Sequence, residues 1–237
     1  MFALFFGGDL KDMHKRKRKW AMPELSICPF YIARPEDWRG RWKLFFENEA
    51  PLQLELGCGK GVSTEQMLYE NKNVNFIAID LISDVLADAR RNISARYGDE
   101  PVRNAALTAF DIMNIGWYFA PEDVVERIHI SFCNPWSAKA RHEKRRLTHP
   151  RQLLQYRAFL QENGEIWFKT DDDRLFEDSI GYFKECGFEI TYITRDLHAV
   201  GFVPNYLTEH EIRYVAKEIP IKFLIAKKMT NVKEMRS

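Results

Sequence analysis

The feature that most constrains the fold is a glycine-rich turn that directly follows a short apolar segment. Residues 52–56 have the composition of a buried strand, and Gly57, Gly59 and Gly61 follow at alternate positions. Glycine allows a sharp turn and lets a ligand approach the backbone closely. In open α/β sheets, nucleotides bind where such a turn follows the carboxyl end of a parallel strand. The segment therefore predicts a nucleotide-like ligand on an α/β sheet.

The spacing of the glycines narrows the kind of ligand. A phosphate-binding G-x-G-x-x-G turn would place a glycine at position 62, where Val62 stands, so the spacing is G-x-G-x-G. Glu55 precedes the turn by two residues, and its carboxylate suits a ligand that carries positive charge. A nicotinamide cofactor and a tight turn without a ligand are the alternatives that this segment alone leaves open.

Apolar, often β-branched segments alternate with helical patterns along the chain. Strands are predicted at residues 52–56, 74–80, 105–110, 127–133, 165–169, 188–194 and 219–226. The alternation implies a parallel sheet with helices on both faces. The last two strands follow each other without a strong helix between them. The α/β chain thus resembles the Rossmann-like seven-stranded methyltransferase sheet, which is mostly parallel with an antiparallel last strand.

Helix signals lie between most of the strands. Helices are predicted at residues 64–70, 84–96 and 174–186, and Gly187 ends the last of them. Thr148 has the character of an N-cap, with Pro150 just inside the helix and Gly164 at its end. The aromatic residues of segment 38–46 predict a short helix that packs on the domain.

The basic residues are unevenly placed along the chain. The net charge is only +1, but basic clusters occupy residues 14–19 and 139–151. This distribution suits a protein that contacts phosphates on one face, with a merely solvated surface as the alternative. We expect a flexible basic tail at residues 1–25 and a packed extension at 26–50. The α/β domain then covers residues 51–228, and 229–237 form a C-terminal tail.

Composition limits the setting in which the chain works. Hydrophobic residues make up 46% of the sequence, but no apolar run is long enough to approach the ~20 residues that a spanning helix needs. The four cysteines are scattered without a C-x-x-C pair, which argues against a zinc site or a disulfide framework. We therefore expect no membrane partner, no metal and a cytoplasmic setting. Monomer and homodimer both stay open.

Two acidic residues stand at the ends of predicted strands. Asp80 ends the second strand, where an acid can accept hydrogen bonds from both hydroxyls of a ribose. The alternative is that Asp80 caps the helix that begins near residue 83. Asp111 follows the third strand, but aspartate is common in any turn, so its signal is weak.

Later segments indicate a flat, polyanionic substrate. Asn134 ends the fourth strand and is followed by Pro135 and Trp136, a stiff platform for a base. The basic segment 141–148 follows directly, and its Lys and Arg side chains could neutralise phosphates. Asp171 ends the fifth strand and could accept hydrogen bonds from the ring N–H and amino group of a guanine.

Together these segments resemble the bacterial tRNA (guanine-N7)-methyltransferase family, which modifies guanine 46 in the tRNA variable loop. The glycine turn alone marks only the wider group of S-adenosylmethionine-dependent methyltransferases. The segments 141–148, 169–171 and 208–211, in that order and at similar spacing, are more specific. Segment 208–211 reads T-x-x-E, which is also the pattern of a helix capping box.

The resemblance implies a cofactor, a partner and a set of site residues. It makes residues 51–228 an S-adenosylmethionine-dependent methyltransferase domain whose partner is tRNA. It places Asn134 and Asp171 in catalysis. The cofactor-binding residues that it implies are Glu55, Gly57, Gly59, Gly61, Asp80, Asp111 and Asn134. The substrate-binding residues that it implies are Lys139, Arg141, His142, Arg145, Arg146, Asp171, Thr208 and Glu211.

Asn134 is the main departure from the family pattern. The family has D-P-W-P-K-K where residues 134–139 read N-P-W-S-A-K. Methylation of N7 turns a neutral guanine into a cation, so losing an adjacent carboxylate would cost roughly 1.5–3 kcal/mol. Two alternatives follow. One is a methyltransferase for an exocyclic amino group, whose N-P-P-Y motif is similar. The other is a weakly active or non-catalytic tRNA-binding paralogue.

Overall fold

The glycine turn lies at the end of an inner strand of one large sheet. The computed structural model describes residues 18–230, and within them the sheet has eight strands in the order β1-β4-β3-β2-β5-β6-β8-β7. The strands are β1 (Tyr31–Ile32), β2 (Leu52–Leu56), β3 (Asn75–Asp80), β4 (Ala105–Ala109), β5 (Val125–Ser131), β6 (Leu160–Thr170), β7 (Phe188–Thr194) and β8 (Lys222–Lys228).

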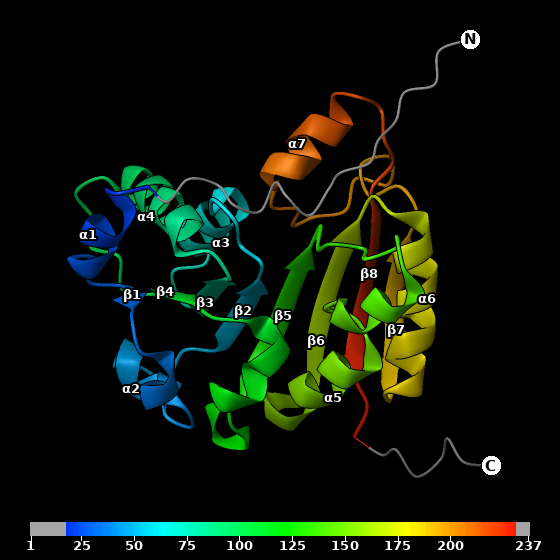
Figure 1. Cartoon of the computed structure of the whole chain (residues 1–237), viewed down its shortest axis with the longest axis horizontal. Helices are drawn as coiled ribbons and strands as arrows, with labels where there is room; N and C mark the ends of the chain where they lie inside the picture. The colour runs from blue at the N-terminus through cyan, green and yellow to red at the C-terminus, as the bar shows by residue number, and fades with distance from the viewer. Residues whose placement is uncertain (1–17, 231–237) are drawn as a thin grey trace.

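The pairing confirms the predicted sheet class. Strand β2 pairs in parallel with β3 on one side and β5 on the other, so Leu56 lies between Ile79 and Ile130. Strand β8 runs antiparallel to both β6 and β7. Because the parallel strands point the same way, their carboxyl ends meet at one edge of the sheet, the upper edge in Figure 1.

An eighth strand, β1, lies within segment 26–50, whereas the first of the seven predicted strands begins at residue 52. Residues Tyr31–Ile32 pair in parallel with β4, opposite Leu107 and Thr108. The Thr108 hydroxyl also donates to the Ile32 carbonyl at 2.9 Å. A two-residue strand is too short to show an alternating pattern, so this edge could not be read from the sequence.

Helices cover both faces of the sheet. Helices α1 (Ala21–Ser26), α3 (Val62–Glu70) and α4 (Ser83–Tyr97) lie on one face, and α2 (Trp42–Phe46), α5 (Pro150–Phe159) and α6 (Asp173–Glu185) on the other. Alternate residues of β3 explain the two layers. Phe76 packs against the helices of the first face, whereas Ile77 and Ile79 pack against those of the second.

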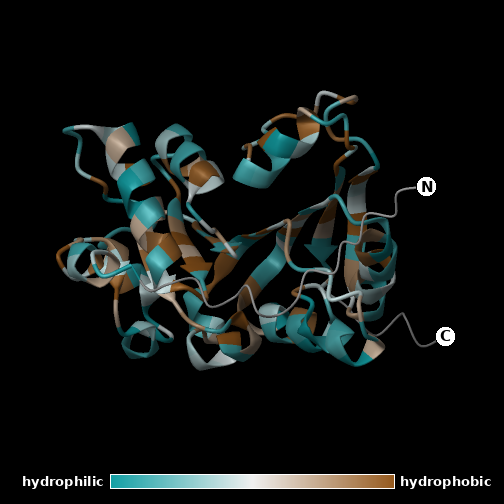
Figure 2. Ribbon diagram, turned by 45° about the horizontal axis from the view of Figure 1, so that its top comes forward, coloured by the Kyte–Doolittle hydropathy of each residue, from teal (hydrophilic) through white to brown (hydrophobic). Residues whose placement is uncertain are grey.

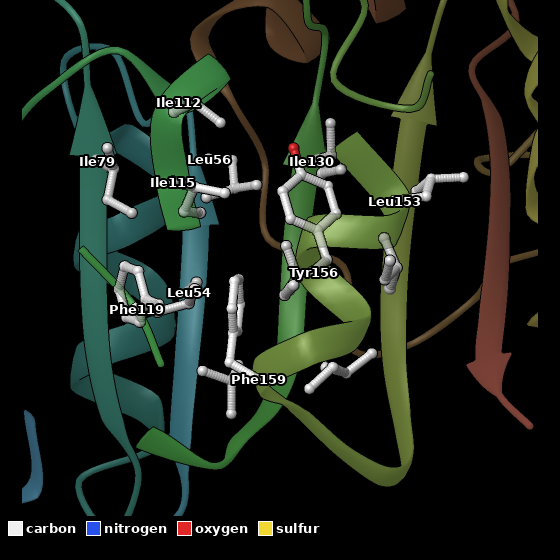
Figure 3. Close-up of a cluster of buried hydrophobic side chains, with 14 of the residues drawn as sticks. Leu54, Leu56, Ile79, Ile112, Ile115, Phe119, Ile130, Leu153, Tyr156 and Phe159 are labelled. Carbon is white, nitrogen blue, oxygen red and sulfur yellow. The ribbon is translucent and has the colours of Figure 1, made fainter. Parts of the chain in front are cut away.

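The core beside the glycine strand is apolar and tightly covered. Figure 3 shows Leu54 and Leu56 of β2 facing the α5 side chains Tyr156 and Phe159, with Phe119 beside them. All five are at most 2% exposed. In Figure 2 the hydrophobic colours gather on the central strands and the hydrophilic ones on the outer helical surfaces. A rigid scaffold therefore carries the strand tips.

Two predicted helix boundaries around α5 were wrong. The N-cap of α5 is His149, whose Nδ1 accepts from the Arg151 amide at 3.2 Å, whereas the Thr148 hydroxyl bonds that of Ser179 at 2.7 Å. The helix ends at Phe159, and Gly164 lies inside β6. A Cβ on Gly164 would lie 2.8 Å from the Leu160 side chain, so this glycine serves close packing and not helix termination.

The folded part of the N-terminal region begins earlier in the sequence than we expected. Helix α1 falls across the boundary placed at residue 25, and its Ala21 and Leu25 are buried against α4. The rest of the predicted tail, residues 1–17, lies outside the described residues, as do residues 231–237 of the C-terminal tail. The second half of the aromatic segment 38–46 forms α2, and its Trp42 is fully buried. Residues 39–41 lie outside the helix.

One further helix stands over the carboxyl edge of the sheet. The connection from β7 to β8 carries α7 (Glu209–Val215), which Figure 1 shows above the arrowheads of β5 and β6. Across residues 18–230, the helices are all too short or too polar to cross a lipid bilayer. The same part of the chain contains no cluster of three or more His, Cys, Asp or Glu side chains arranged to hold a metal.

Candidate active site

A cavity of about 590 Å³ opens at the carboxyl edge of the sheet. Its wall is built from the glycine turn, the tips of β3 and β5, the start of α4 and the start of α7. A volume between about 300 and 1,000 Å³ is usual for sites that bind cofactors or other small molecules. The cavity thus has the size and the position expected for a cofactor site.

The three glycines of the turn have two different roles. Gly57, Gly59 and Gly61 all have positive φ, at 84°, 54° and 70°, which L-residues adopt only with strain. Gly57 and Gly59 line the cavity, and a Cβ on either would meet no atom within 4 Å. A Cβ on Gly61 would lie 2.7 Å from the Ala89 Cβ. The first two glycines therefore shape the cavity, and the third lets α3 approach α4.

Glu55 forms part of the cavity floor. Its side chain is buried at 3% exposure and accepts hydrogen bonds from the hydroxyls of Ser63, at 2.6 Å, and Thr64. Burial raises the pKa of Glu55, while these two hydrogen bonds act in the opposite direction. Burial disfavours the negative charge of the Glu55 carboxylate, and a cationic ligand beside it would favour that charge. The site therefore suits a ligand with a positive group.

Asp80 joins the tip of β3 to the glycine turn. Its carboxylate accepts from the backbone N–H groups of Gly59 and Ile82, both at 3.0 Å. It does not cap α4, whose N-cap Ile82 has no side-chain hydrogen bond. Burial raises the pKa of Asp80. A carboxylate offers about four acceptor positions, so its two bonds leave room for the hydroxyls of a ribose.

Two residues expected at the cofactor lie outside the cavity wall. Asp111 caps the short 3₁₀ helix Ile112–Trp117, with its side chain accepting from the Met113 amide at 2.9 Å. The exposed Asn134 accepts from the Trp136 amide at 2.9 Å and closes a turn. Both side chains therefore have a local structural role in a turn or a helix cap, which the sequence pattern does not distinguish from contact with a ligand.

Asp171 and Thr208 lie on the α7 side of the site. Asp171 is half-buried after β6, beside Tyr214 of α7. Burial, and then the Asp171 carboxylate, raise the pKa of Tyr214. Thr208 lines the cavity and caps α7 by accepting from the Glu211 amide at 3.0 Å. The predicted cap is therefore present, and the same residue forms part of the cavity wall.

Glu211 does not lie where a substrate ligand would. Its carboxylate is fully buried and accepts from Lys169 at 3.0 Å and Asn205 at 2.9 Å. The Glu211 side chain also does not complete a capping box, because it turns to Lys169 and not back to the helix start. Contact with a guanine would require this network to break.

Arg146 is also not a surface residue of the basic loop. It is fully buried and donates to the Pro135 carbonyl and the Asp178 carboxylate, each at 2.7 Å. It therefore fastens the segment after β5 to α6 and is not available to a phosphate. The remaining residues expected to bind RNA are at the surface: Lys139, Arg141 and Arg145 are exposed and His142 is partly exposed.

The comparisons with known proteins extend over the whole site. The family model described as "Putative methyltransferase" matches residues 49–224. A tRNA (guanine-N(7)-)-methyltransferase of Clostridium perfringens (strain SM101 / Type A) is 52% identical across 92% of this chain and 100% of its own length. This chain belongs to the tRNA (guanine-N7)-methyltransferase family. The tRNA (guanine-N(7)-)-methyltransferase of Ruminiclostridium cellulolyticum is 48% identical, across 90% of this chain and 92% of its own.

Solved structures agree with this family's fold at much lower sequence identity. The 16S rRNA methyltransferase KamB gives a TM-score of 0.60 at 11% identity and covers 79% of this chain and 92% of its own. An antibiotic-related methyltransferase gives 0.59 at 13%, with coverage of 82% and 94%. At such identities the likeness shows the methyltransferase fold alone.

The structure also brings together an aromatic group at the cavity that none of the sequence motifs indicated. Phe132 follows β5 and lines the cavity together with His210 of α7, and their ring centroids are 6.1 Å apart. Tyr214 lies 6.0 Å from Phe132 and 6.2 Å from His210. Phe132 lies near the end of the predicted strand 127–133, and this place is the one signal in the sequence that could have indicated it.

Proposed function

We propose that this chain transfers the methyl group of S-adenosylmethionine to N7 of guanine 46 in the variable loop of tRNA. The observation that carries the proposal is 52% identity to a tRNA (guanine-N(7)-)-methyltransferase over that protein's full length, joined to a cavity of about 590 Å³ at the carboxyl edge of the sheet. Since tRNA is the substrate, we place the reaction in the cytoplasm.

The cavity fits S-adenosylmethionine in charge and in shape. Gly57 and Gly59 leave open space where a Cβ would stand, so the backbone can approach the cofactor closely. Asp80 would hold the ribose hydroxyls. Glu55 would face the cationic amino-acid end. When bound, S-adenosylmethionine supplies an electrophilic methyl group on a sulfonium.

The protein's own contribution is positioning and exclusion of water. N7 of guanine has a free lone pair, so no general base is needed to create the nucleophile. Asp171, which lies beside Tyr214 of α7, would accept from the ring N–H and amino group of the guanine, and Thr208 lines the cavity itself. Fixing the base in line with the methyl group lowers the barrier through orientation. The Asp171 carboxylate also favours the positive charge that grows on the base.

The exposed basic residues after β5 supply the contacts to the tRNA backbone. Lys139, Arg141, His142 and Arg145 lie on one segment at the surface, where phosphate contacts position the RNA without reading its sequence. Trp136 is enclosed by two of them: Arg145 lies 5.2 Å from its ring and the His142 ring lies 6.0 Å away. This packing stiffens the segment beside the site.

Asn134 counts against a reaction on an exocyclic amino group. That reaction would use the Asn134 side-chain oxygen to accept a hydrogen bond from the amine. In this chain the same oxygen accepts from the Trp136 amide at 2.9 Å, and the side chain is exposed. N7 methylation makes no such demand on Asn134, so we favour it.

The position in the tRNA is tested with two transcripts that differ at one nucleotide. Wild-type protein is given radiolabelled S-adenosylmethionine and an unmodified tRNA transcript with either guanine or adenine at position 46. We expect methyl incorporation into the first and none into the second. Equal incorporation into both transcripts would show that another nucleotide is the target.

A further inference from the structure

Helix α7 is held at the cavity by the buried ion pair of Glu211 with Lys169 and by the packing of Tyr214 against Phe132. Within its seven residues, all of which the structure describes, only Glu211 is buried. The hydrophobic residues Ile212 and Val215 are 50% and 43% exposed. A helix this short is unstable in water when isolated. Glu211 is therefore the buried anchor of α7, and Glu209 adds a surface ion pair with Lys60 at 2.9 Å.

Lys169, near the end of β6, holds Glu211 and the chain around it. The Lys169 ammonium donates to Glu211 Oε2 at 3.0 Å, to Asn205 Oδ1 at 2.6 Å and to the Tyr206 carbonyl at 2.9 Å. All three acceptors belong to the connection between β7 and β8. An ammonium has three protons to donate, so Lys169 has none left for a cofactor or a base.

The other oxygen of Glu211 is occupied as well. Glu211 Oε1 accepts from Asn205 at 2.9 Å and lies 3.0 Å from Nε2 of His198. Both partners of Glu211 Oε1 thus belong to the same connection between β7 and β8 as Glu211 itself. A buried charge that loses its partner is strongly destabilising, so we expect the loss of Lys169 to loosen the placement of α7.

We propose that Lys169 is a positioning residue that holds α7, through Glu211, as the substrate-side wall of the cavity. The inference rests on the proposed function, because it treats α7 as part of a methyl-transfer site. Thr208, Glu209 and His210 line the cavity at the start of α7, so any movement of the helix displaces that wall. Glu211 then acts through Lys169 and does not touch the guanine.

The chain offers a matched control for Lys169→Met. Lys228 of β8 is similarly buried, with side-chain exposure of 11% against 10% for Lys169. It donates to the Leu160 carbonyl at 2.7 Å and lies 2.9 Å from Glu162, at the far end of β6. Lys228→Met therefore removes an equally buried lysine away from the cavity, where the partner Glu162 is 55% exposed and Glu211 is fully buried. Both full-length variants are tested by limited trypsin cleavage and by steady-state methyl transfer.

Local release of α7 should be visible as cleavage after Arg213, which lies on the helix. In Lys169→Met we expect this cleavage to accelerate by about tenfold or more, because the helix opens without global unfolding. We expect kcat to fall by about tenfold or more, with a smaller change in KM for tRNA, since the basic loop is elsewhere. Lys228→Met should match wild type in both. Unchanged cleavage and unchanged kcat in Lys169→Met would overturn the proposal.

A double variant decides whether Glu211 has a role of its own. Lys169→Met combined with Glu211→Gln should be no slower than Lys169→Met alone, because both changes remove one contact. A further loss of about tenfold would mean that Glu211 acts on the base directly. If Lys169→Met does not fold, Glu211→Gln alone is tested, and wild-type cleavage after Arg213 would contradict the proposal. Cleavage after Arg213 reports on α7 even if the wild-type protein does not methylate tRNA.

Discussion

At the scale of single residues, the sequence identified polar side chains at strand ends but not what each one contacts. Asp80, Asp111 and Asn134 all follow strands, yet only Asp80 lines the cavity. All three accept from the backbone N–H two residues further on, and Asp80 accepts in addition from Gly59 of the glycine turn. Short polar side chains can bond to a ligand or to the local backbone with equal ease. Spacing cannot separate the two uses, because it does not show which N–H lies nearby.

The different roles of Asp80 and Asp111 give a direct comparison. Asp80→Asn should weaken S-adenosylmethionine binding by roughly ten- to a hundredfold, because a charge-assisted hydrogen bond is worth roughly 1.5–3 kcal/mol. Asp111→Asn keeps the cap of its 3₁₀ helix and should bind the cofactor as wild type does. Isothermal titration calorimetry on both variants measures the difference. Equal affinities would remove Asp80 from the cofactor site.

At the scale of secondary structure, apolar patterns located the strands well and the helix ends poorly. Residues 52–56 and 188–194 are strands with the predicted boundaries. Gly164, by contrast, was assigned to a helix end and lies within β6. A glycine can serve a turn or a close approach, and only the neighbouring Leu160 side chain decides which. For α7 the sequence offered only the T-x-x-E cap, because the one buried residue of this helix is charged and leaves no apolar stripe.

The two uses of glycine in the cavity turn can be separated by stability. Gly59→Ala introduces strain at positive φ without a clash and should cost about 1–2 kcal/mol of unfolding free energy. Gly61→Ala adds overpacking against Ala89 and should cost about 2–5 kcal/mol. Urea unfolding of both variants provides the measurement. Equal losses would show that the contact between α3 and α4 is not tight.

At the scale of the whole molecule, the alternation of strands and helices predicted the class of the sheet and the edge that carries the site. It could not predict β1, which has two residues, or the buried interactions that link distant segments. Lys169 illustrates this, because its partners lie 36 to 42 residues away. Such contacts depend on the folded connection between β7 and β8, which no local pattern describes.

The buried His129 gives the whole fold a pH dependence. It lies in β5, bonded to Gln53 at 2.9 Å, and burial lowers its pKa to about 3. The unfolded chain takes up a proton near pH 6.5, whereas the folded chain does not. Stability that is complete above pH 6.5 is therefore lost as the pH falls towards about 3, by up to about 1.4 kcal/mol per pH unit.

His129→Gln removes this proton uptake and isolates its effect. The stability of wild type relative to the variant should fall steadily between pH 6.5 and 4.5, as measured by urea unfolding at each pH. Other buried groups contribute equally to both proteins, so they cancel in the difference. A difference that does not change with pH would mean that His129 takes up a proton as readily in the folded chain as in the unfolded chain.

The chemical identity of the product tests the central claim most directly. An unmodified tRNA transcript is incubated with wild-type protein and S-adenosylmethionine, digested to nucleosides and analysed by mass spectrometry against standards. The account predicts 7-methylguanosine as the methylated nucleoside. A guanosine methylated on its exocyclic amino group, a methylated adenosine, or no methylated nucleoside would contradict it.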